Sequence, residues 1–363
     1  MDIFEKKDAT YENAVIKVIG VGGGGCNAVA HMFSKDIEGV ECIAANTDAK
    51  ALKHIEVDTT LSLGSELTKG LGAGADPEIG RAAAIENRDN IAQVLTGTDM
   101  LFITAGMGGG TGTGAAPIIA EVAQELGILT VAVVTKPFHF EGQVRQKTAS
   151  LGIEALSEQV DSHIVISNDR LLPVLGDTTL VEAFGEVNSV LYDAVCGIAD
   201  LIIRPGLIGL DFADVRAVMH DMGTTMMGTG RVEVGSKAAT KAAEEALSSP
   251  LLENVDLKNA RGILVNVSGG KDLSLKDFTE VGNAVRNIAS EDATIVIGVS
   301  INSNLHDTLK VTVIATGLNA NKPVDKSKLD TILDIPSLGG ISTQDVLDKN
   351  TLANTNQAAQ VSS

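Results

Sequence analysis

The clearest chemical signal in this chain is a run of glycines that follows a short apolar segment. The run is Gly20-Val21-Gly22-Gly23-Gly24-Gly25-Cys26-Asn27, and it comes directly after the predicted strand Val15–Ile19. A helix is expected to follow from about Asn27. Glycines let the backbone approach a ligand closely, and the free N–H groups at a helix start attract anions. The run also satisfies G-x-G-x-x-G, although a tight turn would explain some of these glycines. We interpret it as a phosphate-binding segment, with a structural turn as the alternative.

A second glycine segment strengthens this interpretation. It is Gly106-Met107-Gly108-Gly109-Gly110-Thr111-Gly112-Thr113-Gly114, again between a predicted strand and a predicted helix. Its N–H groups could surround a polyphosphate, and the hydroxyls of Thr111 and Thr113 could add hydrogen bonds. No lysine follows, so the segment is not a G-x-x-x-x-G-K-[ST] loop. A dinucleotide-binding dehydrogenase needs one such segment, whereas this chain has two and a third at Gly70-Leu71-Gly72-Ala73-Gly74-Ala75.

Two carboxylates, Asp211 and Asp214, lie at the start of another predicted helix, which begins at Phe212. The structural interpretation is that Asp211 caps this helix and Asp214 lies in its first turn, where the helix dipole favours a negative charge. The functional interpretation is that the two carboxylates face the same way and orient a water or a cation. Both interpretations stay open at this point.

Composition excludes several other functions. The 28 basic and 47 acidic residues give a net charge of −19, and aromatic residues are sparse, so we expect no nucleic-acid partner. No apolar run approaches the roughly 18 residues needed to cross a bilayer, so we expect no membrane insertion. The six histidines show no paired spacing, so no zinc site is assigned. Three cysteines (Cys26, Cys42, Cys196) without paired spacing and a polar start indicate the cytoplasm, with Cys26 as a packed residue.

The elements that must position these residues alternate between strand and helix, which predicts an α/β fold with a mostly parallel sheet. Further strands are expected at 41–45, 100–104, 129–135 and 162–167, and helices at 77–95 and through Pro117 to Leu126. Apolar residues then recur every three or four positions from Thr179 to Ile203, which predicts one long helix stopped by Pro205-Gly206. Beyond it, strands at 262–267, 294–300 and 309–316 and helices at 237–247 and 274–289 predict a second α/β domain.

This pattern divides the chain into an N-terminal domain over 12–178, a central helix over 179–203, a C-terminal domain over 204–318 and a tail over 319–363. The tail is polar and rich in Asn, Ser, Asp and Lys, so we expect it to be mobile.

The motifs together resemble those of a known family. GGGTGTG is typical of the tubulin/FtsZ superfamily, and VIKVIGVGGGGCNAV, AANTDA, GLGAGADPEIG, PFHFEG, SNDRLL and DFADVR follow the order found in the bacterial FtsZ family. The resemblance covers residues 12 to 318. It implies a Rossmann-like GTP-binding domain, a long central helix, a smaller α/β C-terminal domain, and head-to-tail assembly into protofilaments. It also implies GTP hydrolysis with Mg²⁺ and a place in the division ring at mid-cell.

The resemblance assigns roles to particular residues. The GTP or GDP phosphates would be held by Gly22, Gly23, Gly24, Gly25, Cys26 and Asn27 and by Gly108, Gly109, Gly110, Thr111, Gly112 and Thr113. Gly72, Ala73 and Gly74 would sense the γ-phosphate, and Asp48 would lie near the phosphates and Mg²⁺. Glu141 and Arg145 would contact ribose and phosphate, while Asn168 and Asn188 would bind guanine and Phe184 would stack on it. Each residue also has a structural interpretation: Asp48 as a turn former, Arg145 as a surface charge, Phe184 as core.

The long helix separates the two aspartates from these residues. Phe184 and Asn188 lie near its start, Asp211 and Asp214 lie past its end, and 25 helical residues span roughly 37 Å. The aspartates are therefore expected on the opposite face, where they would complete the nucleotide site of a second subunit, in agreement with the resemblance.

Two positions depart from the family pattern. Gly209 stands where the family usually has Asn, which leaves open a polymer that hydrolyses GTP weakly. Residues 333–338 (LDIPSL) resemble the family's peptide for membrane-tethering division adaptors, but residues 339–363 follow them with a single lysine. The rival hypothesis from another class is an NAD-dependent oxidoreductase that uses the first glycine segment, with Asp48 or Glu41 holding the ribose.

Overall fold

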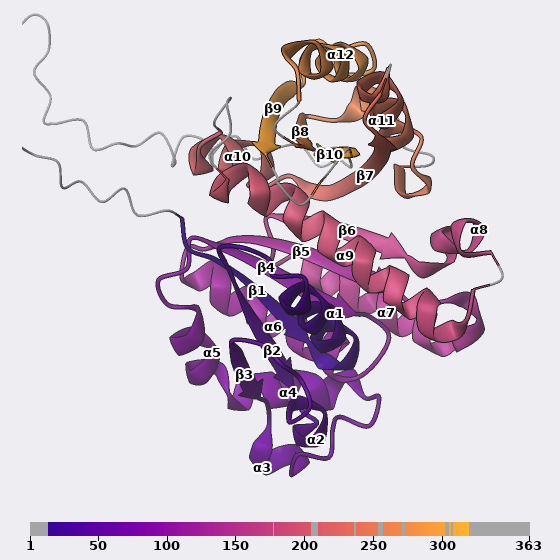
Figure 1. Ribbon diagram of the computed structural model, residues 1–363. Coiled ribbons are helices and arrows are strands. Elements are labelled where there is room, and N and C mark those ends of the chain that lie inside the picture. Colours follow the sequence, from indigo (N-terminus) through magenta and orange to yellow (C-terminus); the bar gives the residue numbers. More distant parts are fainter. Residues whose placement is uncertain are drawn as a thin grey trace, which may run out of the picture. The chain divides into compact units, whose positions relative to one another are not determined.

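A computed structural model describes residues 14–176, 178–204, 210–235, 237–252, 257–270, 273–301, 305 and 308–318. The strands in these ranges form one sheet of ten strands in the order β3-β2-β1-β4-β5-β6-β7-β10-β8-β9 (Figure 1). The strands are β1 Ile16–Val21, β2 Val40–Asn46, β3 Thr59–Ser62, β4 Met100–Gly106, β5 Leu129–Lys136, β6 Ser162–Ser167, β7 Gly223–Glu233, β8 Gly262–Gly269, β9 Thr294–Ile301 and β10 Thr308–Thr316.

The α-helices are α1 Gly22–Ser34, α2 Ala49–Leu52, α3 Ser65–Thr68, α4 Pro77–Glu86, α5 Arg88–Leu95, α6 Thr111–Glu125, α7 Gln143–Ser157, α8 Leu172–Leu175, α9 Leu180–Ile203, α10 Phe212–Met219, α11 Ala238–Leu247 and α12 Leu275–Arg286. Short 3₁₀ turns are η1 His139–Glu141, η2 Asn168–Leu171, η3 Pro250–Leu252 and η4 Leu257–Asn259. No helix among the described residues is both long enough and apolar enough to cross a membrane.

The first six strands are mutually parallel, as the alternation of strand and helix predicted. Their inner members are buried on both faces, which explains why they are almost continuous apolar runs. Successive residues serve opposite faces. Val18 and Phe102 join α1 and α9 in one apolar cluster, whereas Ile19 and Ile103 join α4, α5 and α6 in another. The sheet is therefore covered on both sides.

The second half of the sheet depends on β7, the longest strand. Its residues 223–225 pair in parallel with β6, and its residues 226–233 pair antiparallel with β10. β10 pairs antiparallel with β8, and β8 pairs in parallel with β9. α11 and α12 cover this part of the sheet through a third apolar cluster. The expected second α/β domain is present, while its exact boundaries stay a prediction.

Helix α9 joins the two halves. Thr179 caps it and exchanges hydrogen bonds with Glu182, and 24 residues follow without interruption. Its apolar face packs on the N-terminal sheet. Its other contacts reach the C-terminal strands: Lys310 Nζ donates to Asp193 Oδ1 at 2.6 Å, and Asn266 Nδ2 donates to the Gly197 carbonyl at 3.2 Å. The long helix was predicted correctly, and its expected stop at Pro205-Gly206 lies outside the described residues.

Two expectations about helices were wrong. α1 begins at Gly22 rather than near Asn27, so the glycines form its first turn. The helix expected over 77–95 is two helices that meet at Asn87. Asn87 has a non-helical ψ of 20°, and its Oδ1 accepts a hydrogen bond from Gly64 N at 2.7 Å. The expected N-cap, Asp76, is confirmed because its side chain accepts from Glu78 N at 2.9 Å.

Two helical glycines allow a matched test of the packing between α4 and α6. A Cβ added at Gly114 would overlap the Pro77 carbonyl oxygen, whereas one added at Gly185 would meet no atom within 4 Å. We expect Gly114→Ala to lower the free energy of unfolding by about 1–3 kcal/mol or more. Gly185→Ala should raise it by up to about 1 kcal/mol, because alanine favours helix. Denaturant unfolding measures both, and shifts of the same sign would contradict this account of the packing.

Candidate functional site

The sequence-predicted residues gather at one edge of the parallel sheet. β1, β2, β4, β5 and β6 end at this edge, and the predicted segments follow them directly. From β1 the chain turns toward β2, whereas from β4 it turns toward β5, so the direction of winding reverses between these neighbours. In open parallel sheets ligands bind at such a reversal, outside the carboxyl ends of the strands. The two glycine segments lie on either side of it.

Several glycines are required by backbone contacts between these segments. A Cβ at Gly22 would lie 2.8 Å from Gly112 N, and one at Gly112 would lie 2.7 Å from the Gly106 carbonyl oxygen. A Cβ at Gly25 would overlap the Thr104 carbonyl oxygen. The first turns of α1 and α6 therefore pack directly against backbone at the ends of β1 and β4. At these positions packing requires glycine, whatever the ligand.

Gly23 and Gly109 differ from the others. A Cβ added at either one would meet no atom within 4 Å, so the fold itself gives no reason for glycine there. Gly23 lies in the first turn of α1, where N–H groups have no partner within the helix. Open space in front of unpaired donors at a helix start suits an anion.

The third glycine segment, residues 70–75, lies beside the first two. Gly72 N donates to the Thr47 carbonyl at 3.2 Å, and Leu71 forms an isolated bridge with Asp48. A Cβ at Gly110 would lie 2.9 Å from Ala73 Cβ, so this segment also touches the second one. All three glycine segments, which are far apart in sequence, therefore meet at one place.

Asp48 forms the turn that the structural interpretation required. Its Oδ1 accepts from Lys50 N at 2.9 Å and from Ala51 N at 3.0 Å, which caps α2. The next-door hydroxyl of Thr47 lies 2.6 Å from that of Thr111. Both threonine side chains are buried, and this contact fixes the second glycine segment against the end of β2. The sequence analysis did not include Thr47, since nothing in its own neighbourhood indicates this contact.

Thr113 and Cys26 have partners within the protein. Thr113 Oγ1 accepts from Gly108 N at 2.9 Å, which closes the glycine segment on itself. The Cys26 thiol is buried and lies 3.5 Å from the carbonyl oxygens of Gly20 and Ala45. Burial raises its pKa to about 12. The expectation that Cys26 is a packed residue is confirmed.

At the other end of the site, aromatic and charged side chains meet. Arg145 Nη1 donates to Glu141 Oε2 at 2.7 Å, and Glu141 Oε1 accepts from Phe138 N at 2.9 Å. Phe138 stacks on Phe140 and meets Phe184 edge to face, with ring centroids 5.0 and 5.6 Å apart. Phe184 is 41% exposed, so it is not the core residue of the structural interpretation. Phe140, which the sequence analysis missed, presents a second exposed aromatic face.

The side chain of Asn168 has a buried oxygen that lacks a hydrogen-bond partner among the described residues. Its side chain is 4% exposed, and its Oδ1 is buried without a hydrogen-bond donor in the described part of the chain. The neighbouring Asp169 Oδ1 accepts from His139 N at 2.8 Å, which holds this turn beside the Phe138–Glu141 segment. Leaving a buried acceptor unpaired costs about 1–3 kcal/mol, so this oxygen is available to a group that donates a hydrogen bond. Asn188 is half-buried, one turn beyond Phe184 on α9.

Asp211 and Asp214 are not part of this gathering. They lie at the start of α10, past the end of α9, whose length is roughly 36 Å. In Figure 1, α9 runs from its start near α8 to its end near α10. Asp211 Oδ1 accepts from Asp214 N at 2.8 Å, and Asp214 Oδ2 accepts from Asp211 N at 3.3 Å. The predicted cap is confirmed, and each carboxylate keeps one further exposed oxygen. Gly209 lies outside the described residues.

Comparison with known proteins identifies the family. Residues 15–176 match the model of the Tubulin/FtsZ family, GTPase domain, and residues 223–319 match that of the FtsZ family, C-terminal domain. "Cell division protein FtsZ" from Coxiella burnetii is 57% identical over 93% of this chain and 89% of its own length. That from Pseudomonas aeruginosa is 58% identical over 89% of this chain and 82% of its own length.

A solved structure gives the same result. The FtsZ dimer of M. jannaschii superposes with a TM-score of 0.81 at 43% identity, covering 85% of this chain and 89% of that one. These likenesses also decide against the NAD-dependent oxidoreductase considered from the first glycine segment alone. The chain belongs to the FtsZ family of tubulin-like GTPases.

Proposed function

We propose that this GTPase of cell division binds GTP at the meeting point of the three glycine segments and assembles head to tail into protofilaments. Hydrolysis would then occur at the junction between two subunits, in a division ring at mid-cell. The observation that carries the proposal is the distance, along the whole of α9, between the nucleotide-type residues and the exposed aspartates of α10. The FtsZ dimer among the solved relatives supports self-association.

The phosphates would lie in front of Gly23 and Gly109. The N-terminal first turns of α1 and α6 both start at this edge, and each contributes unpaired N–H groups and a positive dipole end. The packed glycines Gly22, Gly25 and Gly112 support this arrangement because they let the two helix starts approach each other. Gly72, Ala73 and Gly74 would then face the terminal phosphate from the third segment.

Guanine would lie between Asn168, Asn188 and Phe184. The unpaired Oδ1 of Asn168 suits the N–H donors of the guanine edge, and the exposed ring of Phe184 suits stacking on the base. The paired Glu141 and Arg145 would contact the ribose and phosphates on the same side.

The donors near Asp48 fit Mg²⁺, which prefers oxygen ligands. Asp48 keeps one carboxylate oxygen free of its capping contacts and stands beside Gly72. A bound Mg²⁺ would neutralise charge on the phosphates during hydrolysis. Asp211 and Asp214 of the next subunit would orient the water whose oxygen attacks the γ-phosphorus, with GDP as the leaving group.

The adaptor proposal concerns residues outside the described ranges. Residues 333–338, within the segment 319–363, would bind membrane-tethering division adaptors, and this proposal rests on their sequence alone.

Asn168→Ala should reveal base recognition. The variant removes the unpaired acceptor, so GTP affinity should fall by about 1–3 kcal/mol, as for a lost specific contact to a base. ATP affinity, already weaker, should change little. A competition titration with both nucleotides measures this difference. Equal affinity of the wild type for GTP and ATP would contradict the assignment of Asn168.

Gly109→Asp and Gly109→Asn form a matched pair for the phosphate position. Both side chains enter open space, so the melting temperature should stay close to that of the wild type. The carboxylate would repel the phosphates, whereas the amide of similar size would not, so only Gly109→Asp should weaken GTP binding by at least tenfold, about 1.4 kcal/mol. Equal binding by the two variants would place the phosphates elsewhere.

Asp214→Ala should abolish GTP turnover while GTP binding persists. Asp277→Ala is the control, because Asp277 and Ser274 form the same capping box at the start of α12. Each variant should lose about 1 kcal/mol of stability from its cap, and only Asp214→Ala should lose turnover. Phosphate release across a series of protein concentrations is the measurement.

Mixing tests whether the aspartates act on a neighbour. At a GTP concentration that saturates the wild type but not Gly109→Asp, Asp214→Ala and Gly109→Asp should each turn over little GTP, but a junction between them joins an intact nucleotide site to intact aspartates. Partial recovery of turnover in the mixture supports action between subunits. Normal GTP turnover by Asp214→Ala at high dilution would show that the Asp214 carboxylate serves only as part of the helix cap.

A further inference from the structure

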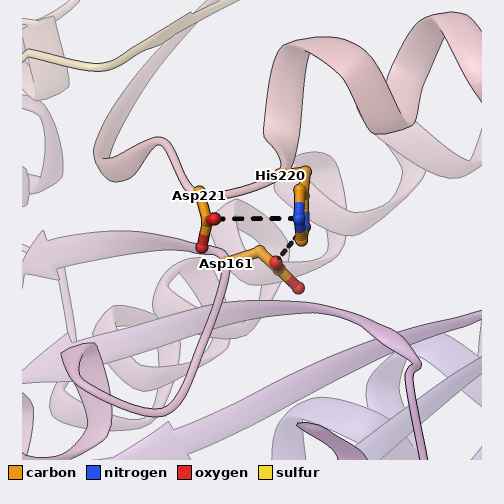
Figure 2. A group of neighbouring side chains, drawn as sticks. All are labelled: Asp161, His220 and Asp221. Atoms are coloured by element: carbon orange, nitrogen blue, oxygen red, sulfur yellow. Dashed lines mark ion pairs between the residues drawn. The ribbon is translucent and has the colours of Figure 1, made fainter. Parts of the chain in front are cut away.

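A histidine and two aspartates lie together where α10 leads into β7, away from the nucleotide residues. Asp161, His220 and Asp221 each offer one potential ligand atom, and these atoms all lie within 4.8 Å of one another. Figure 2 shows dashed lines that join the imidazole of His220 to the carboxylate of Asp161 and to that of Asp221. Asp161 is 59 residues away in sequence from His220, so the fold brings the three together.

Backbone and hydroxyl contacts hold the two sides of this cluster independently of the three side chains. Gly223 N donates to the Asp161 carbonyl at 2.9 Å. Ser162 Oγ donates to the carbonyl of Met219, the last residue of α10, at 2.5 Å. Ser162 also pairs with Gly223 in the parallel ladder of β6 and β7. The positions of Asp161 and His220 are therefore fixed before any ligand binds.

Asp161 is oriented for coordination. Its Oδ2 accepts a hydrogen bond from Thr130 N at 2.8 Å, which leaves Oδ1 directed at His220. Carboxylates that bind metals are commonly held in this way by a second hydrogen bond.

His220 contacts both carboxylates. Its Nδ1 is buried and forms an ion pair with Asp161 Oδ1, and this carboxylate raises the pKa of His220 above its ordinary value. Its Nε2 is 3.7 Å from Asp221 Oδ2, too far for a hydrogen bond. Because one ligand atom from each of the three residues lies within 4.8 Å of the others, a single ion could contact all three.

We propose that Asp161, His220 and Asp221 bind one divalent transition-metal ion of the zinc class. Imidazole nitrogen with carboxylate oxygen is a typical ligand set for such ions, whereas Mg²⁺ and Ca²⁺ prefer oxygen alone. The two carboxylates supply two negative charges, and Arg216 is a nearby cation. Because Asp161 raises the pKa of His220, the ion displaces a proton from the imidazole when it binds. The side chain of Asp221 is 69% exposed, so the ion enters from solvent and water completes its coordination.

The bound ion would tie the segment before β6 to the end of α10. This is the opposite end of the helix from Asp211 and Asp214. Binding of the ion needs neither GTP nor a second subunit, so the metal-site proposal can be tested independently of the proposed hydrolysis.

Zn²⁺ titration of the full-length, nucleotide-free, EDTA-treated protein tests the site. Calorimetry should show one equivalent bound to the wild type, with a rise in melting temperature on Zn²⁺ addition. His220→Ala and Asp161→Asn should bind at least tenfold more weakly, since loss of a ligand costs no less than loss of its supporting hydrogen bond. Asp161→Asn retains an oxygen for Thr130 N, so it guards against failure of His220→Ala to fold.

His54→Ala is the matched control, because it removes an exposed histidine elsewhere and should bind Zn²⁺ like the wild type. Co²⁺ should give the intense visible absorption of a four-coordinate site in the wild type and His54→Ala alone. Excess Mg²⁺ should not displace Zn²⁺. The proposal is overturned if the wild type shows no saturable site, or if folded His220→Ala or Asp161→Asn binds Zn²⁺ as tightly as the wild type.

Discussion

The N-terminal part of the molecule depends on the close approach of backbone to backbone where β1 and β4 end. Gly22 touches Gly112, and Gly25 touches the end of β4, with no room for a Cβ between them. Because the winding reverses at this point, the contact brings two helix starts together beside one another. The first turn of each helix has N–H groups without partners in its own helix. The contact therefore shapes the sheet edge and brings together the two helix starts on which the proposed phosphate site depends.

Much of the fold could be predicted from the sequence, and the failures have physical causes. The inner parallel strands are apolar on both faces, so each was visible as a continuous run. β7 was not, because Gly228 and Gly230 interrupt its pattern. A Cβ at these positions would overlap the Ala246 and Ala242 carbonyl oxygens of α11, and such a close approach cannot be inferred locally. The break at Asn87 depends in the same way on a hydrogen bond to the distant Gly64.

The candidate site shows the same limit: its segments could be predicted from sequence, but its contacts between distant residues could not. Residue types and order indicated which segments meet, but not which glycines serve packing and which face open space. That distinction depends on what lies opposite each one: Gly112 meets Gly106, while Gly23 and Gly109 meet nothing. The unpaired Oδ1 of Asn168 and the cluster around His220 likewise exist only once segments distant in sequence are brought together. Sequence reasoning therefore finds ligand-binding segments more readily than the atoms that bind.

The capping role of Asp211 and Asp214 is compatible with a role toward a neighbouring subunit and favours it. A cap uses one oxygen of each carboxylate and fixes both side chains on an exposed helix start. The cap has already ordered both side chains, so their remaining oxygens are in place before a partner binds. Binding a partner then loses less side-chain entropy. α9 is hydrogen-bonded to Lys310 and Asn266 of the C-terminal strands, and its apolar face packs on the N-terminal sheet. It therefore connects the two halves along its length. Head-to-tail stacking of identical subunits repeats the same geometry at every junction. It therefore requires a fixed distance between the sheet edge proposed to bind the nucleotide and α10, which carries the two aspartates.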